Sequence, residues 1–199
     1  EIESFRPDTV GVGCVTAGYY ECVNLLNEIK ALNPEIVTVV GGHHPTVMPH
    51  DFAKNFVDFI VIGEGEQTFP ELISALERKR DISEVRGLAI PKDGGLMLTG
   101  ERPLIDINEM PLPKRDLTSK YRHRYFRATW RPLACIIGSR GCSFRCSFCC
   151  QWKLNKGKYR VRSPELLVDE LTKIKEPFIA FVDDNSWEDF AWVEQLYLK

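Results

Sequence analysis

The chain has 199 residues, which corresponds to about 1.3 domains of average size. Its 44% hydrophobic and 27% charged residues are typical of a folded globular protein and exclude an intrinsically disordered chain. No apolar stretch approaches the ~18 residues of a membrane span, and no signal peptide is visible. The sequence opens with Glu1 and stops at Lys199 directly after a helical pattern. We therefore expect a piece of a longer protein, cut at both ends.

The net charge of −2 hides a strongly basic segment. Between Lys120 and Arg162 there are twelve Lys or Arg and no acidic residue. An odd total of seven cysteines, of which four lie within residues 142–150 of this segment, does not make a disulfide framework. The local cluster of four thiols instead predicts a metal site in a reducing compartment, the cytoplasm. Cys14 and Cys22 instead lie in apolar strand and helix patterns, and we expect them to be buried.

The first hundred residues alternate apolar strands with helical patterns. Strands without polar alternation are expected at residues 9–15, 36–40 and 58–62, as in sheets buried on both faces. A helix at about 19–32 and a second at about 69–78, with Thr68 as its N-cap, predict a parallel, doubly wound sheet. Such sheets bind ligands past the carboxyl ends of the strands.

Glycine-rich turns follow the second and third of these strands. Gly41 and Gly42 come after the second strand, before a loop at residues 43–50. The third strand ends in a Gly-Glu-Gly-Glu turn at residues 63–66. Two further short strands flank residues 91–95 and predict a hairpin.

A proline-containing stretch at residues 100–132 separates this series from a second one. The second series is expected to contain a strand at 133–138, the cysteine loop, a helix from Pro164 with Ser163 as N-cap, a strand at 178–182 and a helix at about 188–197. A complete (β/α) barrel needs ~200 residues or more. The sequence thus predicts a first domain at 1–99, a linker at 100–132 and the beginning of a second domain at 133–199.

Cys142, Cys146 and Cys149 have the spacing C-x3-C-x2-C. Three thiolates on one loop can hold three corners of a [4Fe-4S] cluster and leave the fourth iron open to another ligand. Zinc is the alternative, although zinc sites usually combine two separated pairs of ligands. Cys150 directly follows Cys149 and is badly placed to bind the same metal. The candidate fourth ligands for zinc are Cys150, Cys135 and His123.

The Ser-Arg-Gly-Cys stretch at residues 139–142, with this cysteine spacing and the aromatic Phe148 before the last cysteine, resembles the radical S-adenosylmethionine (SAM) superfamily. The first domain resembles the cobalamin-binding domain that precedes such barrels. The tryptophan at position 152, just past the motif, resembles the sequence of hopanoid C-3 methylase-like members of the family. The other matching stretches are residues 7–13, 41–46, 63–66, 110–117, 159–165 and 183–185.

The resemblance implies an α/β fold: a Rossmann-like (flavodoxin-like) domain lacking one edge element, followed by the first β/α units of a partial barrel. It implies a cluster on the three cysteines. It also implies SAM contacts from Phe148, Asp184 and Asn185, although the latter two could equally cap the next helix. The implied cobalamin-binding residues are Gly41, Gly42, His43, Gly63, Glu64, Gly65 and Glu66. The family's cobalt-ligating Asp-x-His-x-x-Gly motif is absent from the sequence. His43 and His44 are expected to form local hydrogen bonds instead.

The implied activity is that of a methyltransferase acting on an unactivated carbon of a small molecule of lipid or tetrapyrrole type. SAM would yield a 5′-deoxyadenosyl radical, and methylcobalamin would donate a methyl group. A flavodoxin- or ferredoxin-type donor would supply the electron, and neither nucleic acid nor a membrane span is expected. The piece alone is expected to be inactive, and the sequence assigns no catalytic residue. The alternatives are a cobalamin-dependent cyclase, a tRNA-modifying radical SAM enzyme and a zinc-binding interaction module.

Overall fold

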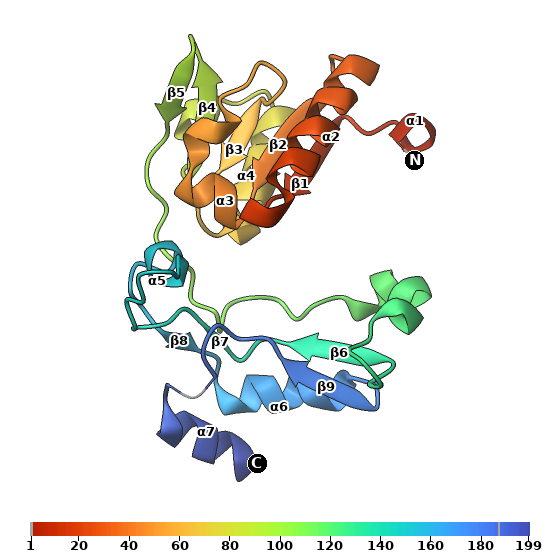
Figure 1. The fold of residues 1–199 in the computed structure, drawn as a ribbon, viewed down its shortest axis with the longest axis vertical. Helices are drawn as coiled ribbons and strands as arrows, with labels where there is room; N and C mark the ends of the chain where they lie inside the picture. Colours follow the sequence, from red (N-terminus) through yellow and green to blue (C-terminus); the bar gives the residue numbers. More distant parts are fainter. Residues whose placement is uncertain (1, 187) are drawn as a thin grey trace. The chain divides into compact units, whose positions relative to one another are not determined.

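The structure is a computed structural model that describes residues 2–186 and 188–199 (Figure 1). It divides into two compact units, one up to Leu104 and one from Ile105 onward. The predicted linker is split by this boundary, and residues 105–132 belong to the second unit. No helix in the described part of the chain is long and apolar enough to cross a membrane.

The first unit is built on a five-stranded sheet of order β1-β2-β3-β4-β5. The strands are β1 (Thr9–Gly13), β2 (Val37–Gly41), β3 (Phe59–Val61), β4 (Leu88–Lys92) and β5 (Gly95–Leu98). β1, β2 and β3 are parallel, as predicted, whereas β4 pairs antiparallel with β3 and with β5. Asp93 and Gly94, with φ of 49° and 77°, close the predicted hairpin. Two residues with positive φ are what the favoured two-residue hairpin turn needs.

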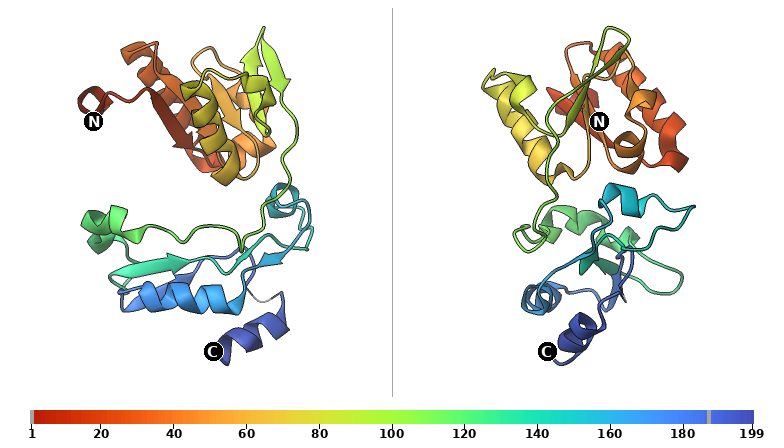
Figure 2. Two further views of the ribbon diagram at one scale, coloured as in Figure 1. Left: turned by 180° about the vertical axis from the view of Figure 1, so that it is seen from behind. Right: turned by 90° about the vertical axis from the view of Figure 1, so that its left-hand side faces the viewer.

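Helices cover both faces of this sheet, as Figure 2 shows. Neighbouring strand residues point to opposite faces, so Val40 packs on one side and Val39 on the other. The Val40 side is covered by α2 (Tyr19–Leu32) and the 3₁₀ helix η2 (Pro49–Phe52). The Val39 side is covered by α4 (Gly65–Glu77). The result is the predicted Rossmann-like arrangement of three layers. The unit also contains α1 (Ile2–Phe5), α3 (His43–Val47) and the 3₁₀ turns η1 (Thr16–Gly18) and η3 (Ile82–Glu84).

Two local predictions were wrong. The segment expected to be a loop forms α3 and η2 instead. The helix expected to start after Thr68 already begins at Gly65, because Gly63, with φ of 80°, turns the chain directly after β3. Thr68 therefore lies inside α4, fully buried, and its hydroxyl donates to the carbonyl of Arg86 at 3.3 Å.

The second unit contains one β-α-β unit. β6 (Leu133–Ile136) and β9 (Phe178–Phe181) are parallel, and α6 (Pro164–Lys173) lies between them in the sequence. The core joins Ile136, Leu167 and Trp192. Ser163 Oγ accepts a hydrogen bond from Leu166 N at 3.3 Å, which confirms the predicted N-cap of α6. The remaining elements are η4 (Arg115–Arg124), β7 (Ser139–Arg140), α5 (Gln151–Leu154), β8 (Arg160–Val161) and α7 (Phe190–Tyr197).

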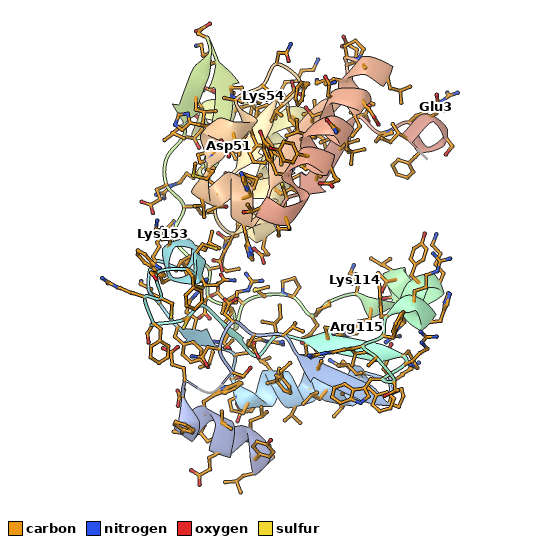
Figure 3. All side chains as sticks on the ribbon, in the orientation of Figure 1. Glu3, Asp51, Lys54, Lys114, Arg115 and Lys153 are labelled. Atoms are coloured by element: carbon orange, nitrogen blue, oxygen red, sulfur yellow. The ribbon has the colours of Figure 1, made fainter. Side chains whose placement is uncertain are left out.

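Ion pairs attach residues 105–132 to this unit. Arg115, labelled in Figure 3, donates to Glu170 Oε1 on α6 at 2.6 Å. Arg162 donates to the other carboxylate oxygen of Glu170 at 2.5 Å. The Glu170 side chain is only 4% exposed, so one buried carboxylate joins η4, α6 and the chain after β8. Arg122 pairs in the same way with Glu176, just before β9.

Candidate functional site

The carboxyl ends of β2 and β3 bring the two glycine-rich turns of the first unit together. Thr46 Oγ1 donates to the carbonyl of Gly42 at 2.8 Å and accepts from the amide of Gly63 at 3.0 Å. The two turns therefore lie on one rim of the parallel strands, as predicted. The residues of this rim are Gly41, Gly42, His43, Gly63, Glu64, Gly65 and Glu66.

Gly42 lets the chain pass close to the segment that follows β1. Its φ is 103°, and an added Cβ would lie 2.9 Å from the carbonyl oxygen of Cys14. The same carbonyl accepts a hydrogen bond from His44 N at 3.1 Å. Only glycine fits this conformation and this space. The start of α3 is thus fixed against the end of β1.

His44 is engaged within the first unit, whereas His43 is exposed. The His44 ring is 8% exposed, with Nδ1 3.0 Å from Thr16 Oγ1 and Nε2 2.8 Å from Asp51 Oδ2. It stacks on Tyr19 at a centroid distance of 5.1 Å. Both ring nitrogens have protein partners, so the expected local hydrogen bonding is confirmed for His44. His43 stands on the rim with its side chain open to solvent.

Glycines at the strand ends leave room for a ligand that approaches the backbone. Gly13 ends β1, and a Cβ built on it, or on Gly63, meets nothing within 4 Å. The glycines therefore leave open space along the ends of β1 and β3. A corrin ring is a ligand of this kind, and the residues present fit it.

The cysteine loop of the second unit lies between β7 and α5, after the carboxyl end of β6. Cys142 and Cys149 are half-buried, whereas Cys146 and Cys150 are exposed. Cys149 N donates to the carbonyl of Cys146 at 3.1 Å, which makes a turn between the second and third thiols of the motif. In residues 2–186 and 188–199, no group of three or more His, Cys, Asp or Glu side chains is arranged to hold a metal ion. The chemistry of the donor set nevertheless fits an iron–sulfur cluster, because its three soft thiols share one exposed loop.

Acidic and amide side chains that follow β9 hold the base of this loop. Asp183 Oδ1 accepts from the amides of Gly138 and Ser139 at 2.7 and 2.6 Å. Asp184 Oδ2 accepts from the amide of Gly141 at 3.1 Å. The amide of Ser143 donates to both carboxylate oxygens of Glu188 at 3.2 Å. We call Asp183, Asp184, Asn185 and Glu188 the clamp.

The clamp also reaches the first cysteine. Asn185 Nδ2 lies 3.8 Å from Cys142 Sγ and 3.2 Å from Glu188 Oε2. Neither Asp184 nor Asn185 caps the next helix, because Asp189 Oδ1 accepts from Trp192 N at 3.0 Å and caps α7. Sequence reasoning placed Asp184 and Asn185 at the site but missed the roles of Asp183 and Glu188. The acidic run directly after a buried strand was the available signal for Asp183; Glu188 gave none.

Gly141 allows the start of the cysteine loop to lie very close to the chain that follows α5. Its φ is 91°, and an added Cβ would lie 2.1 Å from the carbonyl oxygen of Lys158 and 2.8 Å from Asn155 Cβ. Asn155 is buried and accepts a hydrogen bond from Arg160 Nη2 at 2.9 Å. The chain after α5 therefore packs directly on the start of the cysteine loop.

A half-buried tyrosine and further aromatic rings complete the surroundings of the loop. Burial raises the pKa of Tyr159, and the carboxylates Asp183 and Glu188 raise it further, so its hydroxyl stays protonated at neutral pH. Phe148, expected to contact SAM, is 91% exposed near the end of the loop. Arg145 and Lys153 lie over the ring of Trp152 at 5.9 and 5.5 Å. The loop surface is thus both aromatic and cationic.

Known proteins resemble both units of the chain. A protein-family model described as a B12 binding domain matches residues 1–73. The hopanoid C-3 methylase of Methylococcus capsulatus is 38% identical over 194 residues, which cover 92% of this chain and 36% of the methylase. The anaerobic magnesium-protoporphyrin IX monomethyl ester cyclase of Rubrivivax gelatinosus is 35% identical over 177 residues, which cover 86% of this chain and 32% of the cyclase.

The fold is shared with a solved structure over nearly the whole chain. TsrM from Kitasatospora setae, a radical SAM methyltransferase, superposes with a TM-score of 0.76 at 21% identity, over 98% of this chain and 40% of TsrM. The chain spans about a third of the length of the two curated relatives, 36% and 32%. The B12-binding match, the two relatives and the common fold agree with the cysteine motif and the glycine-rich rim. The chain belongs to the family in which a cobalamin-binding domain precedes a radical SAM domain.

Proposed function

We propose that the chain is the cofactor-binding part of a radical SAM methyltransferase that uses a [4Fe-4S] cluster, SAM and cobalamin to methylate an unactivated carbon. The observation that carries this proposal is the cysteine loop itself. Its base is fixed by the clamp, while the thiols of Cys146 and Cys150 at its surface are exposed. A loop of this kind can close around an inorganic cluster without disturbing the β6–β9 core.

In this proposal Cys142, Cys146 and Cys149 hold the cluster. When bound, the cofactors supply a 5′-deoxyadenosyl radical, made from SAM by one-electron reduction, and a methyl group carried on cobalt. The chain's own residues bind and orient. Asp183 and Glu188 fix the loop backbone on either side of Cys142, at Ser139 and Ser143.

We assign SAM recognition to Phe148, Asp184 and Asn185. Phe148 would cover the adenine ring, and the two polar residues would meet the polar end of SAM. The assignment of Asp184 and Asn185 is supported by their position beside the first cysteine of the motif. Asp184 accepts a hydrogen bond from Gly141 N, and Asn185 Nδ2 lies 3.8 Å from Cys142 Sγ.

We assign cobalamin to the rim of the first unit, at Gly41, Gly42, His43 and residues 63–66. Support comes from the coupling of the two turns through Thr46 and from the open space at the rim glycines. His44 is already paired with Thr16 and Asp51, so it is not assigned to cobalt.

Anaerobic reconstitution with iron and sulfide tests the cluster. Single Cys→Ala changes at positions 142, 146 and 149 should each abolish cluster iron and its visible absorbance. Cys150→Ala is the matched control, because Cys150 is exposed on the same segment yet lies outside the motif. Loss of the cluster in the control, or stoichiometric zinc in place of iron, would overturn the assignment and favour the zinc-binding module.

Cobalamin titration of a variant at Gly13, which pairs with the rim residue Gly41, tests the first unit. In Gly13→Leu the added Cβ meets nothing within 4 Å, so we expect the fold to persist. The bulky side chain should lower cobalamin affinity at least tenfold by occupying the open rim. Gly95→Leu, at the far hairpin, is the control and should bind as the parent chain does. Equal affinity in all three proteins would contradict the rim assignment.

A cobalamin-dependent cyclase is the second candidate. It is favoured by the 35% identity to the cyclase of Rubrivivax gelatinosus. Methyl-labelled SAM separates the two activities in the full protein: the label enters the product of a methyltransferase and is absent from the product of a cyclase. A tRNA-modifying enzyme has less support, since Cys14 and Cys22 are buried and do not make a second cluster set.

We further propose a small-molecule substrate, of lipid or tetrapyrrole type, and a flavodoxin- or ferredoxin-type electron donor. The cytoplasm is the proposed location, since the exposed free thiols require a reducing compartment. Pull-down of a reduced flavodoxin by the reconstituted protein would test the donor.

A further inference from the structure

A basic surface rich in aromatic rings lies at the amino end of the β6–β9 sheet. Trp130 stacks on Phe178, the first residue of β9, with ring centroids 6.1 Å apart and ring planes 8° apart. Leu133, the first residue of β6, donates its amide to the carbonyl of Tyr125 at 2.9 Å. The cysteine loop follows the opposite, carboxyl end of β6. The surface therefore lies outside the proposed SAM site and needs its own explanation.

This surface combines exposed cations with exposed apolar side chains. Residues 117–131 contain no Asp or Glu. Leu117 is 72% exposed and Phe126 is 52% exposed, so large apolar side chains accompany the cations of this segment at the surface. We define the basic–aromatic surface by its exposed members, Leu117, Lys120, Tyr121, Arg124, Tyr125, Phe126, Arg127, Trp130 and Arg131.

The underlying segment is held in place by two ion pairs and a tight turn. Arg115 and Arg122 of η4 pair with Glu170 and Glu176, whose side chains are almost completely buried. The backbones of Arg127 and Trp130 exchange hydrogen bonds of 3.1 and 2.9 Å. The surface is thus a fixed feature of the second unit.

Three cationic side chains of the basic–aromatic surface lie close to its aromatic rings. Lys120 Nζ lies 4.7 Å from the centroid of the Tyr121 ring, and Arg131 Cζ lies 4.1 Å from that of Phe126. Arg124 Cζ lies 5.9 Å from the centroid of the Tyr121 ring. In the part of the chain that the structure describes, no carboxylate pairs with Lys120, Arg124 or Arg131. Their charges remain available to an anionic partner.

We propose that the basic–aromatic surface binds an anionic lipid bilayer and lies on it without crossing it. Lys and Arg bind the phosphate headgroups, while Trp, Tyr, Phe and Leu enter the boundary between headgroups and acyl chains. A nucleic acid fits less well. Arg131 covers one face of Phe126, Lys120 and Arg124 cover Tyr121, and Trp130 already stacks on Phe178. Leu117 offers neither stacking nor hydrogen bonds to bases. This proposal is independent of the cofactor chemistry.

Co-sedimentation of the 199-residue chain with vesicles tests the proposal. The chain should bind vesicles containing phosphatidylglycerol and should not bind vesicles of pure phosphatidylcholine. Each Lys or Arg near such a surface changes binding by about fivefold, so Lys120→Gln with Arg124→Gln should weaken binding by about 25-fold. Arg78→Gln with Arg80→Gln removes the same charge from an exposed site in the first unit and should leave binding unchanged.

The aromatic contribution is tested separately. Phe126→Ala with Leu117→Ala should also weaken binding, and brominated lipids should quench tryptophan fluorescence more strongly in the parent chain than in Trp130→Phe. Circular dichroism verifies that each variant is folded. Equal losses in both charge variants, or binding of single-stranded RNA without binding of anionic vesicles, would overturn the proposal. Unchanged vesicle binding by Phe126→Ala with Leu117→Ala would also overturn the proposal, because charge alone would then account for binding.

Discussion

Gly141→Ala is the substitution that most directly tests the geometry of the cysteine loop. Two separate penalties add up at this position. A side chain at φ of 91° costs about 1–2 kcal/mol. The new Cβ also lies 2.1 Å from the carbonyl oxygen of Lys158, so the chain after α5 has to move, at a typical cost of about 1–3 kcal/mol. The second unit should therefore lose roughly 2–5 kcal/mol of unfolding free energy.

Gly157→Ala is a matched control on the same segment. Gly157 also has a positive φ, 67°, but a Cβ built on it meets nothing within 4 Å. Only the conformational penalty of about 1–2 kcal/mol remains. The difference between the two variants isolates the contact between Gly141 and the chain after α5.

Urea denaturation monitored by tryptophan fluorescence is the suitable assay. All four tryptophans lie in the second unit, at positions 130, 152, 187 and 192, so the fluorescence transition reports that unit alone. The transition of Gly141→Ala should fall at lower urea than that of Gly157→Ala. Equal shifts for the two variants would refute the close approach described for the loop.

Two further predictions use the same measurement, and a third uses circular dichroism. Glu170→Ala leaves Arg115 and Arg162 without their buried partner and should cost about 3–5 kcal/mol in the fluorescence transition; a loss below about 1 kcal/mol would show that water replaces the carboxylate. Asp189→Ala removes the N-cap of α7 and should cost about 1 kcal/mol. Burial raises the pKa of Cys22 to about 12, so above pH 9 the unfolded chain releases a proton that the folded chain keeps. Stability of the first unit, read by circular dichroism, should thus fall as pH rises from 9 toward 12, and Cys22→Ala should flatten that fall.

The sequence predicted those elements whose signals are local. Apolar runs without polar alternation marked the three parallel strands, because a strand covered on both faces has no polar side. The N-cap of α6 followed from Ser163 and Pro164, which are adjacent to the helix that they start. The hairpin followed from Asp93 and Gly94, whose positive φ values suit a tight turn.

The sequence failed where distant groups decide the conformation. Thr68 looked like an N-cap, but the turn at Gly63 lets α4 start earlier, and the hydroxyl instead bonds to Arg86 across 18 residues. The clamp was only half predicted for the same reason. Asp183 and Glu188 act on amides 44 and 45 residues earlier in the chain, and no spacing rule connects such positions.

The separation along the sequence between the clamp and the loop that it holds has a consequence for synthesis of the protein. Asp184 and Asn185 follow Gly141 and Cys142 by 43 residues. At the usual ribosomal rate of about 5–20 residues per second, the clamp is made roughly 2–9 s after the first thiol of the motif. During this interval the cysteines belong to an unanchored chain, open both to metal delivery and to oxidation. The timing of β9 translation therefore sets the window in which the thiols must be protected.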